Sequence, residues 1–214
     1  MTLIVDLLQE TAQKIRRAPE PTLVTAYREA ARKLCLESRW LRRNAEPILT
    51  EADDNQYLLT LGSVDAGLEI ISVRTIIADN QQGTPQSWRM GPSDPTAWNP
   101  SVQPGAPWTY AYVPEAEIAL FPTPDGEYEL AAVVCVQPTL DAEEIPDDLV
   151  RKHNRSMTLG ALAYLYGIPG QAWSDPQSAM VNARAFQAAI NNATADVQRS
   201  YNMGTVVARI PRVF

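Results

Sequence analysis

Apolar residues recur with a helical period at both ends of the chain, and that period is lost in between. The first predicted helix has an apolar face made of Leu3, Leu7, Leu8, Ala12 and Ile15. Two prolines within residues 18–21 end it, and a second helix is predicted to follow and to stop before Pro47. The apolar face of this second helix consists of Leu23, Tyr27, Ala30, Leu34 and Leu41.

Two further helices are predicted in the last third of the chain, each with a recognisable start. Pro146, Asp147 and Asp148 place a proline and two carboxylates in a first turn, where the positive end of the helix dipole favours acids. Asp175 followed by Pro176 is typical of an N-cap residue and a first helical position. We therefore expect one helix to start near Asp147 and another near Pro176.

The middle of the chain has the pattern of β-strands. Five segments are rich in β-branched and aromatic residues and are bounded by turn-forming residues: 57–61, 68–77, 108–113, 117–121 and 128–137. The Trp- and Pro-rich stretch 81–107 is predicted to be a long structured loop with at most one short strand. The predicted fold class is therefore α+β: a helical bundle formed by the N- and C-terminal helices, with an inserted small antiparallel β-sheet domain and an extended C-terminal arm.

Charge is segregated along the chain in the same way. Residues 1–43 carry nine basic and five acidic side chains. Residues 44–150 carry two basic and eighteen acidic side chains, and residues 151–214 carry seven basic and two acidic ones. The predicted domains are the N-terminal helices of the bundle (1–50), the inserted β-rich acidic domain (51–140), the C-terminal helices of the bundle (141–201) and an extended docking arm (202–214). The two kinds of domain should therefore face different surroundings.

Few residues point to catalysis or metal binding. His153 is the only histidine, and Cys35 and Cys135 are far apart, so buried reduced thiols are favoured over a disulfide or a zinc site. Neither a glycine-rich phosphate loop nor a Gly-x-Ser-x-Gly elbow is present. We predict no catalytic residue, no metal and no cofactor. The apolar start is broken by Asp6, which argues against a signal peptide, and no apolar run approaches the ~20 residues that cross a bilayer.

Three features leave alternatives open. The carboxylates Asp141, Glu143, Glu144, Asp147 and Asp148 could include the acid/base pair of a glycan hydrolase, although acids at a helix start usually stabilise the helix. Tryptophans at 40, 88, 98, 108 and 173 could stack sugars or bases, although three of them lie in the acidic third, which should repel phosphate. The basic residues of the second helix form either a solvated face or a surface for an acidic partner or nucleic acid.

The C-terminal segment 202–214 is apolar and basic. Its candidate contact residues are Val206, Val207, Arg209, Ile210, Pro211, Arg212, Val213 and Phe214. Thirteen extended residues span ~43 Å, far enough to reach across a neighbouring molecule. This composition favours an arm that docks along the surface or sheet edge of a partner.

The order of these parts resembles that of a known family. The most specific stretches are 119–130 (Ala-Leu-Phe-Pro-Thr-Pro-Asp-Gly-Glu-Tyr-Glu-Leu), 136–138, 145–149, 159–166 and 173–176. In these stretches the chain resembles the head-to-tail adaptor proteins of podovirus-type phages, the tail tubular protein A-like family that also includes head-completion connectors. The resemblance covers most of the chain, and residues 108–200 carry it best.

The resemblance implies a structural subunit without enzymatic activity, located in the tail or neck of the virion and assembled in the host cytoplasm. Twelve copies would form a ring between the portal protein and the tail nozzle or tail-tube protein, and DNA would pass through its channel without specific binding. The arm would dock on the portal, with Arg209, Arg212 and Phe214 as its main contacts. The alternatives are another tail-tube or completion protein of the virion and a virion-associated glycan hydrolase.

Overall fold

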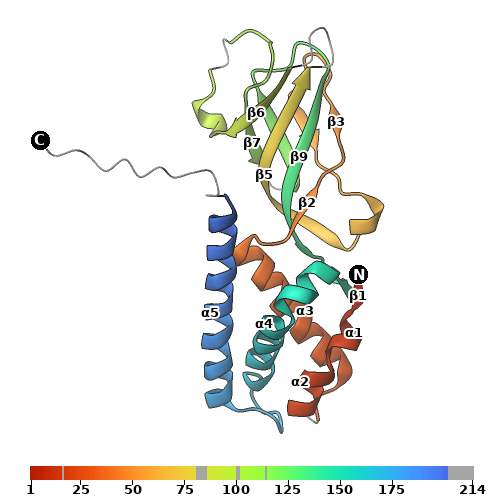
Figure 1. The fold of residues 1–214 in the computed structure, drawn as a ribbon, viewed down its shortest axis with the longest axis vertical. Helices are drawn as coiled ribbons and strands as arrows, with labels where there is room; N and C mark the ends of the chain where they lie inside the picture. The colour runs from red at the N-terminus through yellow and green to blue at the C-terminus, as the bar shows by residue number, and fades with distance from the viewer. Residues whose placement is uncertain (16, 81–85, 100–101, 114, 202–214) are drawn as a thin grey trace, which may run out of the picture. The chain divides into compact units, whose positions relative to one another are not determined.

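The computed structural model describes residues 1–15, 17–80, 86–99, 102–113 and 115–201. These residues form two units (Figure 1). We call the first the helical unit, which combines Met1–Trp40 with the chain from Ile145 onward, and the second the sheet unit, Leu41–Glu144.

The helical unit contains three long helices and two short ones. The long helices are α3 (Glu20–Ser38), α4 (Asp147–Tyr166) and α5 (Pro176–Tyr201), and the short ones are α1 (Ile4–Leu7) and α2 (Gln9–Lys14). Helix α3 ends earlier than its apolar period predicts, because Arg39 adopts a left-handed conformation with φ 51°. A two-stranded sheet pairs β1 (Thr2–Leu3) with β10 (Glu144–Ile145).

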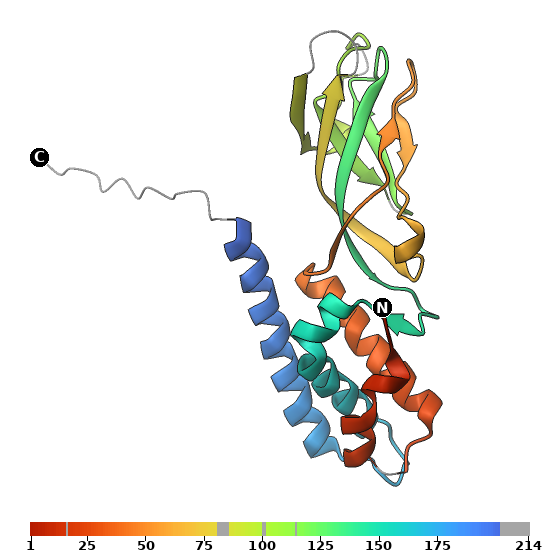
Figure 2. The same cartoon turned by 45° about the vertical axis from the view of Figure 1, so that its right-hand side comes forward.

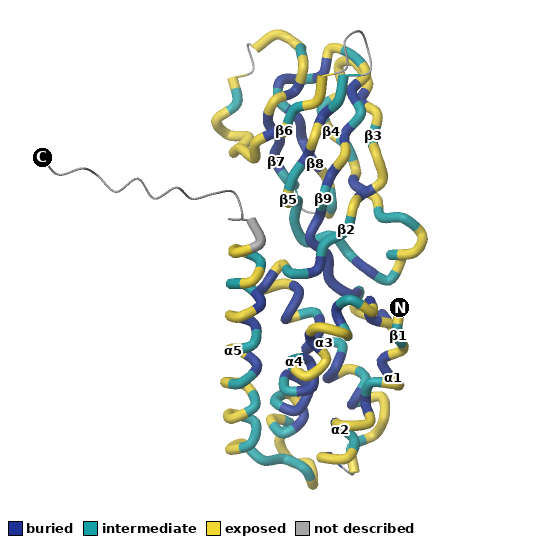
Figure 3. Tube along the Cα trace, viewed as in Figure 1, coloured by how far each residue is buried: buried dark blue, intermediate teal, exposed yellow. Residues whose placement is uncertain are grey.

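Helix α4 lies between the other two long helices and packs closely against both. Helix α4 contacts both α3 and α5, and α3 also contacts α5. Gly160 on α4 makes this approach possible, since a Cβ atom there would lie 2.7 Å from the Cβ of Ala30 and 2.8 Å from the ring of Phe186. One face of α5 is buried and the other exposed, as Figure 3 shows, and the buried face includes Phe186, Ile190 and Ala193.

The sheet unit contains eight strands in one sheet. They are β2 (Arg42–Asn44), β3 (Ile48–Leu49), β4 (Gln56–Leu58), β5 (Leu68–Asn80), β6 (Gln86–Pro92), β7 (Thr109–Val113), β8 (Glu117–Phe121) and β9 (Tyr128–Pro138), with short 3₁₀ turns η1 (Ser63–Asp65) and η2 (Pro95–Ala97). The strand order is β2-β9-β5-β6-β7-β8-β4, and β3 also pairs with β9. The five predicted strands are confirmed as β4, β5, β7, β8 and β9; β8 has the predicted bounds, and the ends of the others differ by at most three residues.

The sheet curls into a half-barrel whose two edges approach each other (Figure 2). Beyond β2, the amide of Glu46 donates to the carbonyl of Thr60 at 2.9 Å, and the Thr60 hydroxyl donates to the Glu46 carboxylate at 3.0 Å. The Tyr57 hydroxyl on β4 accepts from the amide of Glu51 at 3.1 Å. These bonds occupy polar groups beside both edges, which limits pairing with another chain there.

The predicted fold class is wrong, because the sheet is neither small nor wholly antiparallel. The described residues contain ten strands, eight of them in a half-barrel that fills Leu41–Glu144, and β6 pairs with β7 in parallel. The prediction did not include β2, whose sequence Arg42-Arg43-Asn44 is polar. β6 is the one short strand that the prediction allowed within residues 81–107. Their hydrogen bonds to β9 and β5 hold them as strands despite a weak local preference.

Candidate functional site

Metal ligands and membrane-spanning helices were both sought among the described residues. Within them, no cluster of three or more His, Cys, Asp or Glu side chains is placed to hold a metal ion. Cys35 and Cys135 are both buried, and neither is in a disulfide. None of the helices in the described ranges is long and apolar enough to cross a bilayer.

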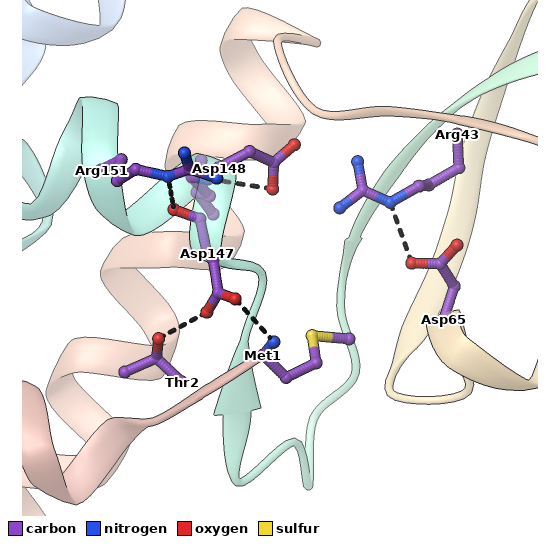
Figure 4. Close-up of polar contacts among 8 residues, drawn as sticks. Met1, Thr2, Arg43, Asp65, Asp147, Asp148 and Arg151 are labelled. Carbon is purple, nitrogen blue, oxygen red and sulfur yellow. Dashed lines mark hydrogen bonds and ion pairs between the residues drawn. The ribbon is translucent and has the colours of Figure 1, made fainter.

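Asp147 and Asp148, two of the five carboxylates considered for a hydrolase, make contacts that organise the start of α4 (Figure 4). Asp147 accepts hydrogen bonds from the Thr2 hydroxyl at 2.6 Å and from the N-terminal amine of Met1 at 3.1 Å. These two donors hold the pKa of Asp147 below its usual value. The Asp148 carboxylate accepts from the amide of Leu149 at 3.1 Å. Asp147 thus ties the beginning of the chain to α4, a contact between residues 146 positions apart.

His153 lies on α4 inside the helical unit, with 7% of its surface exposed. Its ring meets the Trp40 ring edge-on, with 4.7 Å between centroids, and its Nε2 atom has no hydrogen-bond partner. Burial lowers the pKa of His153, and the neighbouring Lys152 charge lowers it further. The Lys152 amine lies 5.1 Å from the Trp40 ring centroid and pairs with Asp196 at 3.4 Å. The neutral ring therefore belongs to the packing of this unit.

Three of the tryptophans hold the Trp- and Pro-rich stretch against the sheet. The Trp98 ring stacks on Phe121 with 5.2 Å between centroids, and the Trp108 ring meets Phe121 edge-on at 5.8 Å. The indole N–H of Trp88 donates to the carbonyl of Pro107 at 2.8 Å. Trp108 nevertheless keeps 60% of its surface exposed. These contacts fit a role for Trp88, Trp98 and Trp108 in anchoring the Trp- and Pro-rich stretch.

The two units carry opposite charge. Residues 41–144 contain four arginines, no lysine and sixteen carboxylates, whereas the rest of the chain contains fourteen basic and nine acidic side chains. Oppositely charged surfaces steer and orient association between proteins. The charge of each unit therefore bears on which partner it meets.

The sheet unit also has a pocket of about 500 Å³, which we call the sheet pocket. It is lined by Leu59, Thr60, Leu61, Asp65, Ala66, Leu68, Glu69, Ile70, Glu115 and Ala116. Three of these residues are acidic and none is basic. Asp65 forms an ion pair with Arg43 at 2.9 Å (Figure 4), and Glu69 accepts from the side-chain amide of Gln137. Glu115 and Ala116 of the lining have positive φ, 75° and 67°.

Sequence analysis did not find this pocket. Its lining comes from three separate stretches, 59–61, 65–70 and 115–116, which the curl of the sheet brings together. The leucines and Ile70 fit the apolar pattern of strands and their ends, so their sequence carries no sign of a pocket. The only sequence feature that pointed toward an acidic pocket was the excess of carboxylates in the middle third of the chain.

The predicted docking arm lies outside the described residues. Helix α5 extends to Tyr201, and the candidate contacts Val206, Val207, Arg209, Ile210, Pro211, Arg212, Val213 and Phe214 all follow it. The portal-docking role of these residues remains a prediction.

Comparison with known proteins identifies the family. A family model described as SU10 adaptor protein matches residues 1–209, which is nearly the whole chain. The chain therefore belongs to the SU10 adaptor protein family, and it is a structural adaptor protein of a phage virion. A search of curated proteins finds no match. The predicted resemblance to phage head-to-tail adaptors is confirmed at the level of the family.

Proposed function

We propose that this chain is one subunit of a twelve-membered ring that joins the portal to the tail nozzle or tail tube. The observation that carries this proposal is the adaptor-family match over residues 1–209. The opposite charges of the two units support it, because a ring closes through two different, complementary surfaces on each copy. DNA passes through the ring, and acidic residues facing the channel prevent phosphate from adhering.

In this proposal the arm, residues 202–214, docks on the portal. Apolar side chains beside Arg209 and Arg212 provide both burial and charge-assisted hydrogen bonds to a partner surface. The subunit acts without catalysis in the neck of the virion, after assembly in the host cytoplasm. A place elsewhere in the tail, as a tube or completion protein, is the alternative.

Portal binding is the direct test. The full chain is mixed with purified portal of the same phage, and the mass of the complex is measured by mass photometry. We expect twelve copies per portal ring. A triple variant, Arg209→Ala, Arg212→Ala and Phe214→Ala, should lose this binding while keeping its far-UV circular dichroism spectrum.

A matched control changes two arginines and one apolar residue that are exposed on the helical unit: Arg17→Ala, Arg184→Ala and Val181→Ala. This control should bind the portal like the wild type. Binding to the tail tube without binding to the portal would place the chain at another level of the tail. Equal portal binding by the triple variant and the wild type would refute the role of the arm.

The hydrolase alternative has its own test. Asp147→Asn together with Asp148→Asn should leave infectivity of the assembled phage unchanged if these carboxylates only organise the start of α4. Purified wild-type protein should release no reducing sugar from host cell-wall glycan. Release by the wild type that disappears in the double variant would establish catalysis.

A further inference from the structure

The sheet pocket combines apolar walls with acceptors for a cation. Leu59 and Leu68 are buried, whereas Leu61 and Ile70 are only partly covered, so the walls offer apolar surface to an incoming side chain. Glu69 and Glu115 add carboxylates to this lining. An arginine side chain has the same two parts, an apolar stem and a charged, planar head.

A buried glutamine outside the pocket lining holds the Glu69 carboxylate in place. Gln137 is 7% exposed and lies opposite Glu69 in the β5–β9 pairing. Its Nε2 atom donates to the Glu69 carboxylate, which fixes the orientation of the amide, and its Oε1 atom has no partner. The Glu69 carboxylate has about four lone-pair sites on its two oxygens, so it can accept hydrogen bonds from a ligand while it is bonded to Gln137. A guanidinium group has five N–H donors, and two of them can bond to one carboxylate at the same time.

The chain itself contains a segment with this chemistry. Residues 205–214 read Thr-Val-Val-Ala-Arg-Ile-Pro-Arg-Val-Phe, in which Arg209 and Arg212 alternate with apolar residues and no acid occurs. It follows α5 and, at thirteen residues from 202 to 214, spans up to ~43 Å when extended. Its charge is opposite to that of the sheet unit, so it is attracted to that unit and repelled by a basic surface.

We propose that the sheet pocket binds the C-terminal segment 202–214 of a second copy of this chain, with Arg209 or Arg212 inserted beside Glu69. This goes beyond the docking of the arm on the portal, because it provides a contact between copies that needs no portal. The two uses of the arm are mutually exclusive. Portal therefore competes with self-association, and the arm is transferred from the neighbouring copy to the portal when the neck assembles.

Sedimentation velocity of the full chain tests this contact. The pocket variant Glu69→Gln with Glu115→Gln retains side-chain size, and the arm variant Arg209→Gln with Arg212→Gln removes the cations. Each should weaken self-association roughly 10-fold or more, because charge-assisted hydrogen bonds are lost. The control Glu51→Gln with Glu127→Gln has the same net charge as the pocket variant and lies outside the pocket lining. It should associate like the wild type.

Mixing the two variants gives the sharpest result. The pocket variant retains an intact arm and the arm variant an intact pocket, so an equimolar mixture should form a one-to-one complex that neither forms alone. Equal loss in the control, or no complex in the mixture, would overturn the proposal. A wild type that stays monomeric while a synthetic peptide of residues 202–214 binds only the arm variant would show docking within one chain, which also overturns it.

Portal binding provides an independent readout. The pocket variant should still bind the portal, because its arm is intact, and it should do so at lower protein concentration than the wild type. Loss of self-association with retained portal binding supports both proposals. Retained self-association in the arm variant, together with lost portal binding, would refute the contact between the arm and the sheet pocket and support the contact between the arm and the portal.

Discussion

Replacing Gly160 by Ala should destabilise the helical unit, although alanine is the better helix former. The added Cβ would lie 2.7 Å from the Cβ of Ala30 on α3, and 2.8 Å and 2.9 Å from two ring atoms of Phe186 on α5. Carbon atoms in favourable contact are about 3.5–4.0 Å apart. The Ala30 Cβ is attached to the backbone and cannot rotate away, so α3 and α4 must separate by nearly 1 Å.

The magnitude follows from two opposing effects. Ala stabilises a helix interior by about 1 kcal/mol relative to Gly. Adding a methyl group to a filled core costs about 1–3 kcal/mol, and the upper end applies because two helices are displaced at once and both Ala30 and Phe186 are buried. We expect a net loss of about 2 kcal/mol in the free energy of unfolding.

Urea unfolding followed at 222 nm measures this loss. Gly62→Ala is the control, because a Cβ there meets no atom within 4 Å and the backbone has φ −61°. It should change the unfolding free energy by less than about 0.5 kcal/mol. Combining Gly160→Ala with Ala30→Gly should recover part of the loss, so the double variant is more stable than the sum of the single effects. A Gly160→Ala protein as stable as the wild type would refute the close packing of α3 on α4.

Three further predictions concern single side chains of the helical unit. The Asp175 carboxylate caps α5, and its pKa is lowered by hydrogen bonds from the hydroxyl and amide of Ser178. Asp175→Ala should lower the thermal midpoint by about 2–4 °C. In the wild type, the stabilisation from the cap should be lost as pH falls below 4. His153 has a lowered pKa in the fold, so stability should decline as pH falls below 6.5, and urea midpoints of His153→Phe between pH 7 and 5 should decline less. Tyr27→Phe removes the hydrogen bond from a fully buried hydroxyl to Asn154 and should cost about 1–2 kcal/mol in urea unfolding; an unchanged midpoint would contradict that bond.

Part of the fold could be predicted because its signals are local. Asp175 accepts from the amides of Gln177 and Ser178, so the cap is formed by residues within one turn. The β-branched runs of β5 and β9 satisfy the strand pattern by themselves. The family could also be inferred, because it rests on residue types in order along the chain. The size of the sheet could not, since β2 and β6 become strands only when β9 and β5 lie beside them.

The sequence by itself determined where the helices of the last third begin, which segments form five of the strands, and how charge divides between the ends and the middle of the chain. Tertiary structure alone decided the half-barrel, its parallel pair and the sheet pocket. The reason is physical: a cap or an alternating strand needs only neighbours in sequence, whereas a pocket needs distant segments to meet. The hydrogen bond from Gln137 to Glu69 joins residues 68 positions apart. No local sequence pattern predicts this bond, or that the Oε1 atom of Gln137 has no hydrogen-bond partner.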